Sequence, residues 1–310
     1  MFLFHPIKSG KAILKSLEDR LFRIETRQRV ADRRLEKIQE ALGRVELRQL
    51  SDSASTNLND YEFRVFSQWG EDGIIQHLVR NIEVANRVFV EFGVQDYREA
   101  NTRFLLVNNN WSGLLLDSNP ENVARIQADP IYWAYNIRAV EAFVTRDNIN
   151  QLLQAQGISG EIGLLSIDID GNDFWIWQAI DVVTPVIVVI EYNYRFGSDT
   201  TVTIPYREDF DRMKSPHAPR YFGASLGALC WLAERKGYSF VGCSSNGVNA
   251  FFVRRDKRPA AIRELSPSEG YCEGKFSEHF DENGLCIKQT RLLEHESIDG
   301  FDLIDVSTLE

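Results

Sequence analysis

The sequence predicts an α/β protein with a mostly parallel sheet, preceded by a long N-terminal helix. Two observations carry this prediction. Beyond residue 60, short apolar runs alternate with segments of helical pattern, which is typical of a doubly wound sheet. In the N-terminal part of the chain, residues 14–49 follow a heptad repeat, and no proline falls between Ile7 and Asp52. The 310 residues are enough for one large domain with an appendage.

The N-terminal helix repeats apolar or glutamine side chains at alternating steps of three and four residues. These positions are Leu14, Leu17, Leu21, Ile24, Gln28, Ala31, Leu35, Ile38, Leu42, Val45 and Gln49. A seam of about five heptads indicates a coiled coil, in which Gln28 and Gln49 could set register or oligomer number. We expect a homo-oligomer through residues 14–49, because so polar a helix has little else against which to bury its stripe. Two alternatives stay open: packing on the chain's own domain, and contact of its arginines with a membrane surface.

The charge is unevenly distributed between the helix and the remaining chain. Residues 1–50 contain 12 basic and 7 acidic residues, whereas the whole chain has a formal net charge of −10. The N-terminal segment therefore carries +5 and residues 51–310 carry −15. An acidic body argues against nucleic acid as a partner, because that binding needs a basic face to neutralise phosphates.

Composition narrows the class of protein. A hydrophobic content of 44% and a charged content of 26% are typical of soluble globular proteins. No stretch approaches the ~20 apolar residues of a membrane span, and the N-terminal start is too short for a signal peptide. The four cysteines form no CxxC pair, so we expect reduced thiols and a cytoplasmic protein. They are Cys230, Cys243, Cys272 and Cys286.

The remaining chain divides into a linker, a central domain and a tail. Residues 51–60 are small and polar and are predicted to be a linker, residues 61–255 form the α/β domain, and residues 256–310 form an acidic extension of unassigned structure. Apolar runs predict strands at 87–92, 113–116, 162–167 and 186–190, with a closing antiparallel pair at 238–241 and 248–253. Helices are expected at 71–81, 100–108, 120–128, 146–154, 174–180 and 225–236.

Acidic residues follow the first two predicted strands, at the edge where open α/β sheets bind ligands. Glu91 and Gly93 end the first strand: the glycine permits close approach of a ligand, and the carboxylate can accept a hydrogen bond. Asp117 lies 24 residues after Gly93, near the ~20-residue offset at which an acid meets ribose hydroxyls. In the structural alternative, Glu91 caps local backbone amides and Asp117 caps the next helix. A GxGxxG loop is absent, which argues against a dinucleotide.

A denser acidic group follows the later strands. Asp168 and Asp170 are spaced i and i+2, so both point to one side, and Glu191 ends the next strand. Like charges so close need a cation, a proton or donors, and Mg²⁺ is a candidate. Alternatively, Asp173 caps a helix while Asp168 accepts backbone amides. In the long loop at 196–220, His217 is the leading candidate base, although such a residue is more often simply on the surface.

At these residues the sequence resembles the FkbM-like branch of S-adenosylmethionine-dependent methyltransferases, in particular the subgroup encoded among bacterial surface-polysaccharide genes. The resemblance covers roughly residues 61–255 and is carried by 67–73, 90–94, 111–117, 166–173, 189–193 and 221–226. It implies a class I methyltransferase-like, Rossmann-like fold: a mostly parallel seven-stranded sheet with a C-terminal antiparallel hairpin. The chain departs from the pattern at residues 95–97, where further glycines are usual.

The resemblance also implies roles for individual residues. Glu91 and Gly93 match the first cofactor motif, Asp117 matches the acid that holds the cofactor ribose, and Asp168, Asp170 and Gly171 match an Ile-Asp-Val-Glu-Gly segment. We therefore expect cofactor binding by Glu91, Gly93, Asp117 and Asp168. Catalysis is expected from Asp170, His217 and Glu191, and cation binding from Asp168, Asp170 and Glu191.

The expected function is transfer of a methyl group from S-adenosylmethionine to a sugar hydroxyl of a glycan or polysaccharide intermediate, in the bacterial cytoplasm or at its membrane. Positioning and desolvation would supply most of the acceleration. A non-catalytic methyltransferase-like scaffold in a surface-polysaccharide assembly is the alternative. A nicotinamide-dependent sugar oxidoreductase is disfavoured because the phosphate loop is absent.

Overall fold

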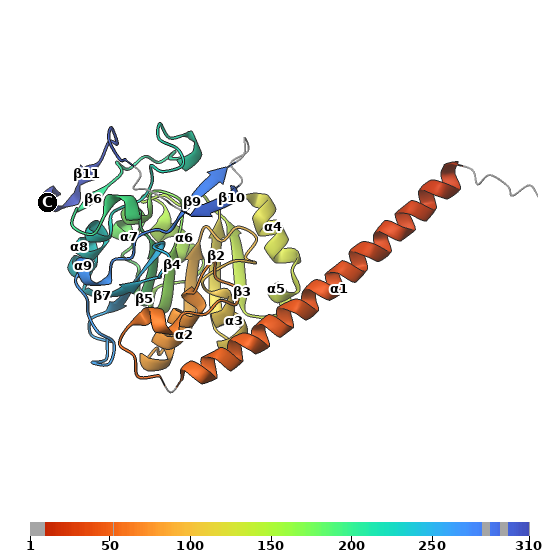
Figure 1. Cartoon of the computed structure of the whole chain (residues 1–310), viewed down its shortest axis with the longest axis horizontal. Helices are drawn as coiled ribbons and strands as arrows, with labels where there is room; N and C mark the ends of the chain where they lie inside the picture. Colours follow the sequence, from red (N-terminus) through yellow and green to blue (C-terminus); the bar gives the residue numbers. More distant parts are fainter. Residues whose placement is uncertain (1–9, 52, 281–285, 292–296, 310) are drawn as a thin grey trace, which may run out of the picture. The chain divides into compact units, whose positions relative to one another are not determined.

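The computed structural model describes residues 10–51, 53–280, 286–291 and 297–309, and it divides into two compact units (Figure 1). The boundary between the units falls between Glu46 and Leu47. It lies inside the first helix, so the last turn of that helix belongs to the second unit.

Helix α1 (Gly10–Leu50) forms the described part of the first unit up to Glu46, and it confirms the long N-terminal helix. The apolar seam residues of this unit are open to solvent, with exposed fractions from 45% at Val45 to 63% at Leu35. In the second unit, Leu47 and Leu50 pack against a small apolar cluster that includes Phe63. The helical prediction is therefore confirmed, whereas self-association stays a prediction.

The second unit contains a seven-stranded sheet in the order β3-β2-β1-β4-β5-β8-β7. Its strands are β1 (Val88–Phe92), β2 (Ser112–Asp117), β3 (Ile137–Glu141), β4 (Gly160–Ile167), β5 (Val183–Glu191), β7 (Tyr238–Cys243) and β8 (Asn249–Arg254). The first five strands are parallel, and β8 pairs antiparallel with both β5 and β7. This arrangement confirms the methyltransferase-like fold, including its C-terminal antiparallel hairpin.

Strand β3 was missed by the apolar-run criterion. Its residues alternate between buried Ile137 and Ala139 and exposed Arg138 and Glu141. As the first strand of the sheet order it pairs only with β2, so it needs no continuous apolar run. Its end brings the following loop, Ala142–Val144, to the edge of the sheet at which β2 also ends.

Two apolar clusters cover the two faces of the sheet, because alternate strand residues point to opposite sides. Val90 and Phe92 join one cluster, whereas Phe89 joins the other. Helices α6 (Ile149–Ala155), α7 (Asp173–Ala179) and α8 (Leu226–Lys236) contribute to the first cluster. Helices α2 (Glu71–Asn81), α3 (Arg103–Asn109), α4 (Pro120–Ala128) and α5 (Pro130–Ala134) contribute to the second.

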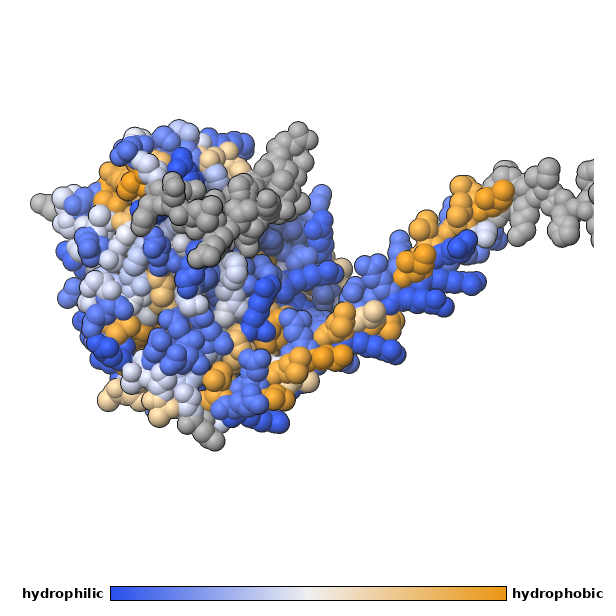
Figure 2. Space-filling model, in the orientation of Figure 1, coloured by the Kyte–Doolittle hydropathy of each residue, from blue (hydrophilic) through white to orange (hydrophobic). Residues whose placement is uncertain are grey.

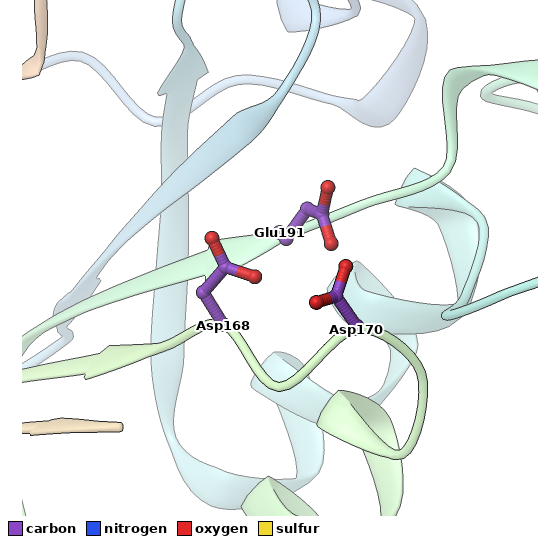
Figure 3. A group of neighbouring side chains, drawn as sticks. All are labelled: Asp168, Asp170 and Glu191. Carbon is purple, nitrogen blue, oxygen red and sulfur yellow. The ribbon is translucent and has the colours of Figure 1, made fainter. Parts of the chain in front are cut away.

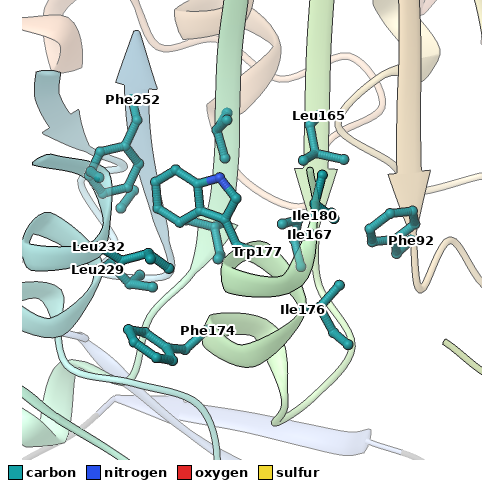
Figure 4. Close-up of a cluster of buried hydrophobic side chains, with 14 of the residues drawn as sticks. Phe92, Leu165, Ile167, Phe174, Ile176, Trp177, Ile180, Leu229, Leu232 and Phe252 are labelled. Atoms are coloured by element: carbon teal, nitrogen blue, oxygen red, sulfur yellow. The ribbon is translucent and has the colours of Figure 1, made fainter. Parts of the chain in front are cut away.

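The centre of the first cluster is the contact between α7, α8 and the sheet (Figure 4). Trp177 is 1% exposed and packs its indole against the rings of Phe252 and Tyr238. Phe174 and Ile176, on the same short helix, are fully buried. Helix α7 is thereby fixed to the sheet directly after the acidic segment 168–173, which holds that segment at the carboxyl ends of the strands.

Parts of the predicted linker and tail form short elements within the second unit. The 3-10 helix η1 (Leu58–Tyr61) buries both of its terminal side chains. Strand β11 (Ile304–Asp305) pairs with β6 (Val202–Thr203), and the short helix η4 (Val306–Thr308) buries Val306.

The second unit also contains the short 3-10 helices η2 (Tyr194–Phe196) and η3 (Arg212–Lys214). The tail also contains helix α9 (Pro267–Gly270) and a strand pair, β9 (Phe276–Phe280) and β10 (Cys286–Arg291). Among the residues that the structure describes, no helix has the length and apolar character of a membrane span.

Candidate functional site

A polar pocket of about 580 Å³ lies where β1, β2, β4 and β5 end. This volume is in the range of small-molecule sites. Five of the predicted site residues line the pocket: Gly93, Asp117, Asp168, Asp170 and Glu191. The carboxyl-end rule for parallel sheets therefore located the pocket correctly.

Gly93 is required by the close approach of two backbone segments. Its φ of +70° is unfavourable for other residues, and an added Cβ would lie only 1.7 Å from the carbonyl oxygen of Asp168. Its amide donates to the carbonyl of Leu116 at 3.0 Å. The glycine thus lets the end of β1 sit directly against the start of the acidic segment, in addition to lining the pocket.

Glu91 is placed differently from the other predicted residues. Its buried carboxylate accepts hydrogen bonds from the amides of Asn101 at 2.9 Å and Thr102 at 3.2 Å, and from the Thr102 hydroxyl. Burial raises the pKa of Glu91. Glu91 is not among the residues that line the pocket. These contacts match the structural alternative, in which the carboxylate caps local amides and fixes the loop after β1.

Asp117 does line the pocket, with its two carboxylate oxygens oriented by three donors. Oδ2 accepts from the amide of Gln95 at 2.7 Å, and Oδ1 accepts from the amide of Asn119 at 2.9 Å and the side chain of Asn122 at 3.1 Å. A carboxylate has about four acceptor sites, so one remains for a ligand hydroxyl. The cap of α4 is Asn119, which accepts from Glu121, so Asp117 is not used as the helix cap.

Gln95 and Asn122 are pocket residues that sequence reasoning missed. Gln95 has a φ of +48°, and Tyr97 two residues later has a φ of +62°. The chain at 95–97 therefore makes a left-handed turn without the usual glycines, and that turn aims the Gln95 amide at Asp117. The positive φ values could not be read from the residue types.

Asp168, Asp170 and Glu191 form the acidic cluster, with one carboxylate oxygen of each lying within 4.8 Å of the others (Figure 3). Asp168 follows β4, and Glu191 is the last residue of β5. Burial, reinforced by neighbouring carboxylates, raises the pKa of Asp168 and of Glu191 well above their ordinary values. Glu191 Oε2 is fully buried and has no hydrogen-bond partner among the described residues. The cluster is thus short of donors for the negative charge it holds.

Asp173 shapes the backbone of this cluster. Its carboxylate accepts from the amides of Ile169 and Gly171, each at 2.9 Å, and burial raises its pKa to about 6. Between those two amides, Asp170 has a φ of +59° and an exposed side chain. A non-glycine residue in this conformation is uncommon and is held here by the Asp173 contacts.

Arg212 supplies the cluster with one positive charge and was also missed from the sequence. Its guanidinium lies 2.8 Å from Asp170 Oδ1, and its side chain is only 12% exposed. It donates from Nε to the carbonyl of Pro219 at 2.7 Å and stacks 3.8 Å over the ring of Phe222. Arg212 lies 42 residues after Asp170 in the sequence. The loop that brings the two side chains together contains no recognisable sequence motif.

His217 is not brought to the acidic cluster. Its ring stacks on Phe301 with centroids 4.6 Å apart, and Nε2 lies 3.2 Å from the carbonyl oxygen of Gly300. His217 is absent from the lining of the pocket. Its environment fits the alternative of a residue packed at the surface, between its loop and the C-terminal segment.

No protein-family model matches the chain, and no curated protein matches its sequence. The chain has structural similarity to several S-adenosylmethionine-dependent methyltransferases. A putative caffeoyl-CoA O-methyltransferase from Staphylococcus aureus is 12% identical with a TM-score of 0.40, covering 71% of this chain and 98% of its own. A methyltransferase from Clostridium acetobutylicum is 11% identical with a TM-score of 0.39, covering 59% and 89%. The N-terminal domain of EvdMO1 with S-adenosylhomocysteine bound is 14% identical with a TM-score of 0.37, covering 55% and 74%.

Proposed function

We propose that the protein is an S-adenosylmethionine-dependent O-methyltransferase that acts on a sugar hydroxyl. The observation that carries the proposal is that one pocket holds both Asp117, oriented with a free acceptor site, and the acidic cluster of Asp168, Asp170 and Glu191. The first suits a ribose hydroxyl, and the second suits an acceptor hydroxyl that must lose a proton.

The pocket residues fit S-adenosylmethionine, which when bound supplies a methyl group on a sulfonium. Asp117 would accept from a ribose hydroxyl. Phe143, 53% exposed and lining the same pocket after β3, offers an aromatic face to the adenine ring. The acidic cluster favours the positive sulfonium over the neutral product, which assists product release.

The acidic cluster also fits a divalent cation with a preference for oxygen ligands, such as Mg²⁺. Asp168, Asp170 and Glu191 would hold it, and the buried, unpartnered Oε2 of Glu191 is the observation that favours it. The cation would lower the pKa of the acceptor hydroxyl. Arg212 already balances part of the charge at Asp170, so a bound cation adds to that balance.

The chain's own residues would move the proton and exclude water. Glu191, whose pKa is raised by burial and by the neighbouring carboxylates, would take the proton of the acceptor hydroxyl. Asp170, exposed and held by Arg212, would accept a hydrogen bond from the acceptor sugar and orient it. Phe210 and Phe222, from the chain between β5 and α8, line the pocket and would limit the access of water.

A methyl-transfer assay with the 310-residue chain tests the proposal. S-adenosylmethionine carrying a labelled methyl is incubated with a panel of nucleotide sugars and oligosaccharides, with Mg²⁺ or with EDTA. We expect label in the sugar fraction, lost at least ~100-fold in Glu191→Gln, and unchanged in the distant control His217→Gln. Cofactor binding without transfer to any acceptor would favour the alternative of a non-catalytic scaffold, and the absence of cofactor binding would refute the proposal.

A further inference from the structure

The first unit leaves an apolar stripe along most of its length without a partner in the described chain. Figure 2 shows apolar residues gathered along α1 beside charged ones. Eight seam residues are 45% to 63% exposed: Leu14, Leu17, Leu21, Ile24, Leu35, Ile38, Leu42 and Val45. The last seam residue, Gln49, lies beyond the first unit, in the turn whose Leu47 and Leu50 pack in the second unit. Contiguous exposed apolar surface of this kind marks an interaction site.

The heptad positions of the seam indicate how many chains cover it. With Leu14 as position a, leucine occupies four of five a positions up to Leu42, and Gln28 occupies the fifth. The d positions hold Leu17 and Ala31 together with the β-branched Ile24, Ile38 and Val45. Leucine at a with isoleucine at d shifts coiled coils away from dimers toward trimers and tetramers.

The residues beside the seam carry charges that separate by side. The g positions bear Arg20, Arg27 and Arg34, and the e positions bear Glu18, Glu25, Asp32 and Glu46. The remaining g and e positions in residues 13–46 are uncharged: Ile13, Ala41 and Gln39. One flank of the seam is therefore basic and the other is acidic.

This separation favours one orientation of neighbouring helices. In a parallel pair, a g residue meets the e residue five positions later on the next chain. Arg20 then faces Glu25, and Arg27 faces Asp32, while no like charges meet. In an antiparallel pair, g faces g and e faces e, so arginine meets arginine and acid meets acid. The four paired residues are Arg20, Glu25, Arg27 and Asp32. In the described part of the chain they have no ion-pair partner, so their charges are available to another copy.

We infer that α1 assembles with other copies of this chain as a parallel bundle of three or four helices. The apolar stripe of each helix thus packs against the same stripe on identical chains. The leucine and isoleucine positions favour this number of helices, and the g-to-e charge pairs favour their parallel orientation. Because each second unit follows the C-terminal end of α1, a parallel bundle brings several copies of the pocket to the same end. Such an arrangement raises the local concentration of sites for a substrate with repeated units. The inference about assembly does not depend on the proposed activity.

The first test is the molar mass of the full chain by sedimentation equilibrium. We expect three or four times 35.6 kDa. Leu21→Asn, at a seam position, should dissociate the assembly, whereas Phe22→Asn should not. Phe22 is the matched control because it is 65% exposed on the same helix and lies off the seam. A mass of one or two chains, or equal effects of the two variants, would overturn the inference.

The second test is orientation by charge reversal. Arg27→Glu and Asp32→Arg should each raise the concentration of half-dissociation about tenfold, and the double variant should return it toward that of the unchanged chain. In an antiparallel assembly, each single reversal would instead remove a like-charge contact and strengthen association. That result, or a double variant no better than the singles, would overturn the parallel arrangement.

Discussion

Replacing Gly93 by alanine tests whether the end of β1 is held against the acidic segment as the structure describes. The added Cβ would lie 1.7 Å from the Asp168 carbonyl oxygen, where an ordinary C···O contact is about 3.3 Å. The two segments would have to separate by more than an ångström, which strains the hydrogen bond from Gly93 to Leu116. The left-handed backbone at +70° adds about 1–2 kcal/mol of its own.

The expected loss of unfolding free energy for Gly93→Ala is about 4 kcal/mol, from backbone strain, overpacking and the weakened hydrogen bond. Gly157→Ala is the matched control, since Gly157 has a φ of +71° and nothing lies within 4 Å of its added Cβ. The control should lose only about 1–2 kcal/mol. Urea unfolding followed by tryptophan fluorescence measures both. Equal losses in the two variants, within about 0.5 kcal/mol, would refute the close approach of Gly93 to Asp168.

Three further variants test the charges of the second unit. Glu191→Gln should raise stability at pH 7 by about 1 kcal/mol while lowering methyl transfer at least ~100-fold, because burial and the neighbouring carboxylates disfavour the ionised Glu191 side chain; a loss of stability in thermal unfolding would contradict this. Arg212→Met should lower the melting temperature, since Asp170 loses its counter-ion, and added Mg²⁺ should reduce the loss; an unchanged melting temperature would contradict it. Burial lowers the pKa of His77 from 6.5 to about 4. The contribution of neutral His77 to the free energy of unfolding is therefore present above pH 6.5 and is lost as the pH falls toward 4. In His77→Gln, the free energy of unfolding measured in urea should therefore fall less between pH 7 and pH 5, by about 1 kcal/mol, a value reduced because the side chain is partly exposed. An equal fall in the variant and the unchanged chain would refute this.

Most of the fold could be predicted because buried strands carry their own signal. The central strands of the seven-stranded sheet are continuous apolar runs, and within that sheet only the alternating edge strand β3 was not predicted. The length of α1 followed from its heptads and from the lack of proline. The packing of the tail could not be predicted, because it depends on a two-residue pairing of β11 with β6 and on isolated buried side chains such as Ile262 and Val306.

The site divides in the same way between local and long-range causes. The cluster of Asp168, Asp170 and Glu191 was predictable, because parallel strands deliver their carboxyl ends to one edge. The inward orientation of Glu91 and the approach of Arg212 were not, because both depend on loops whose conformation no local pattern encodes. Residue types therefore located the pocket, and long-range contacts decided which of them face it.

We propose that the pocket beside Asp117 binds S-adenosylmethionine. Isothermal titration calorimetry of the 310-residue chain with S-adenosylhomocysteine measures this binding, with Asp117→Ala as the comparison variant. We predict saturable binding at one site per chain, weakened at least about tenfold in Asp117→Ala while thermal unfolding stays cooperative. An absence of binding to the unchanged protein, or equal binding by the variant, would contradict the account.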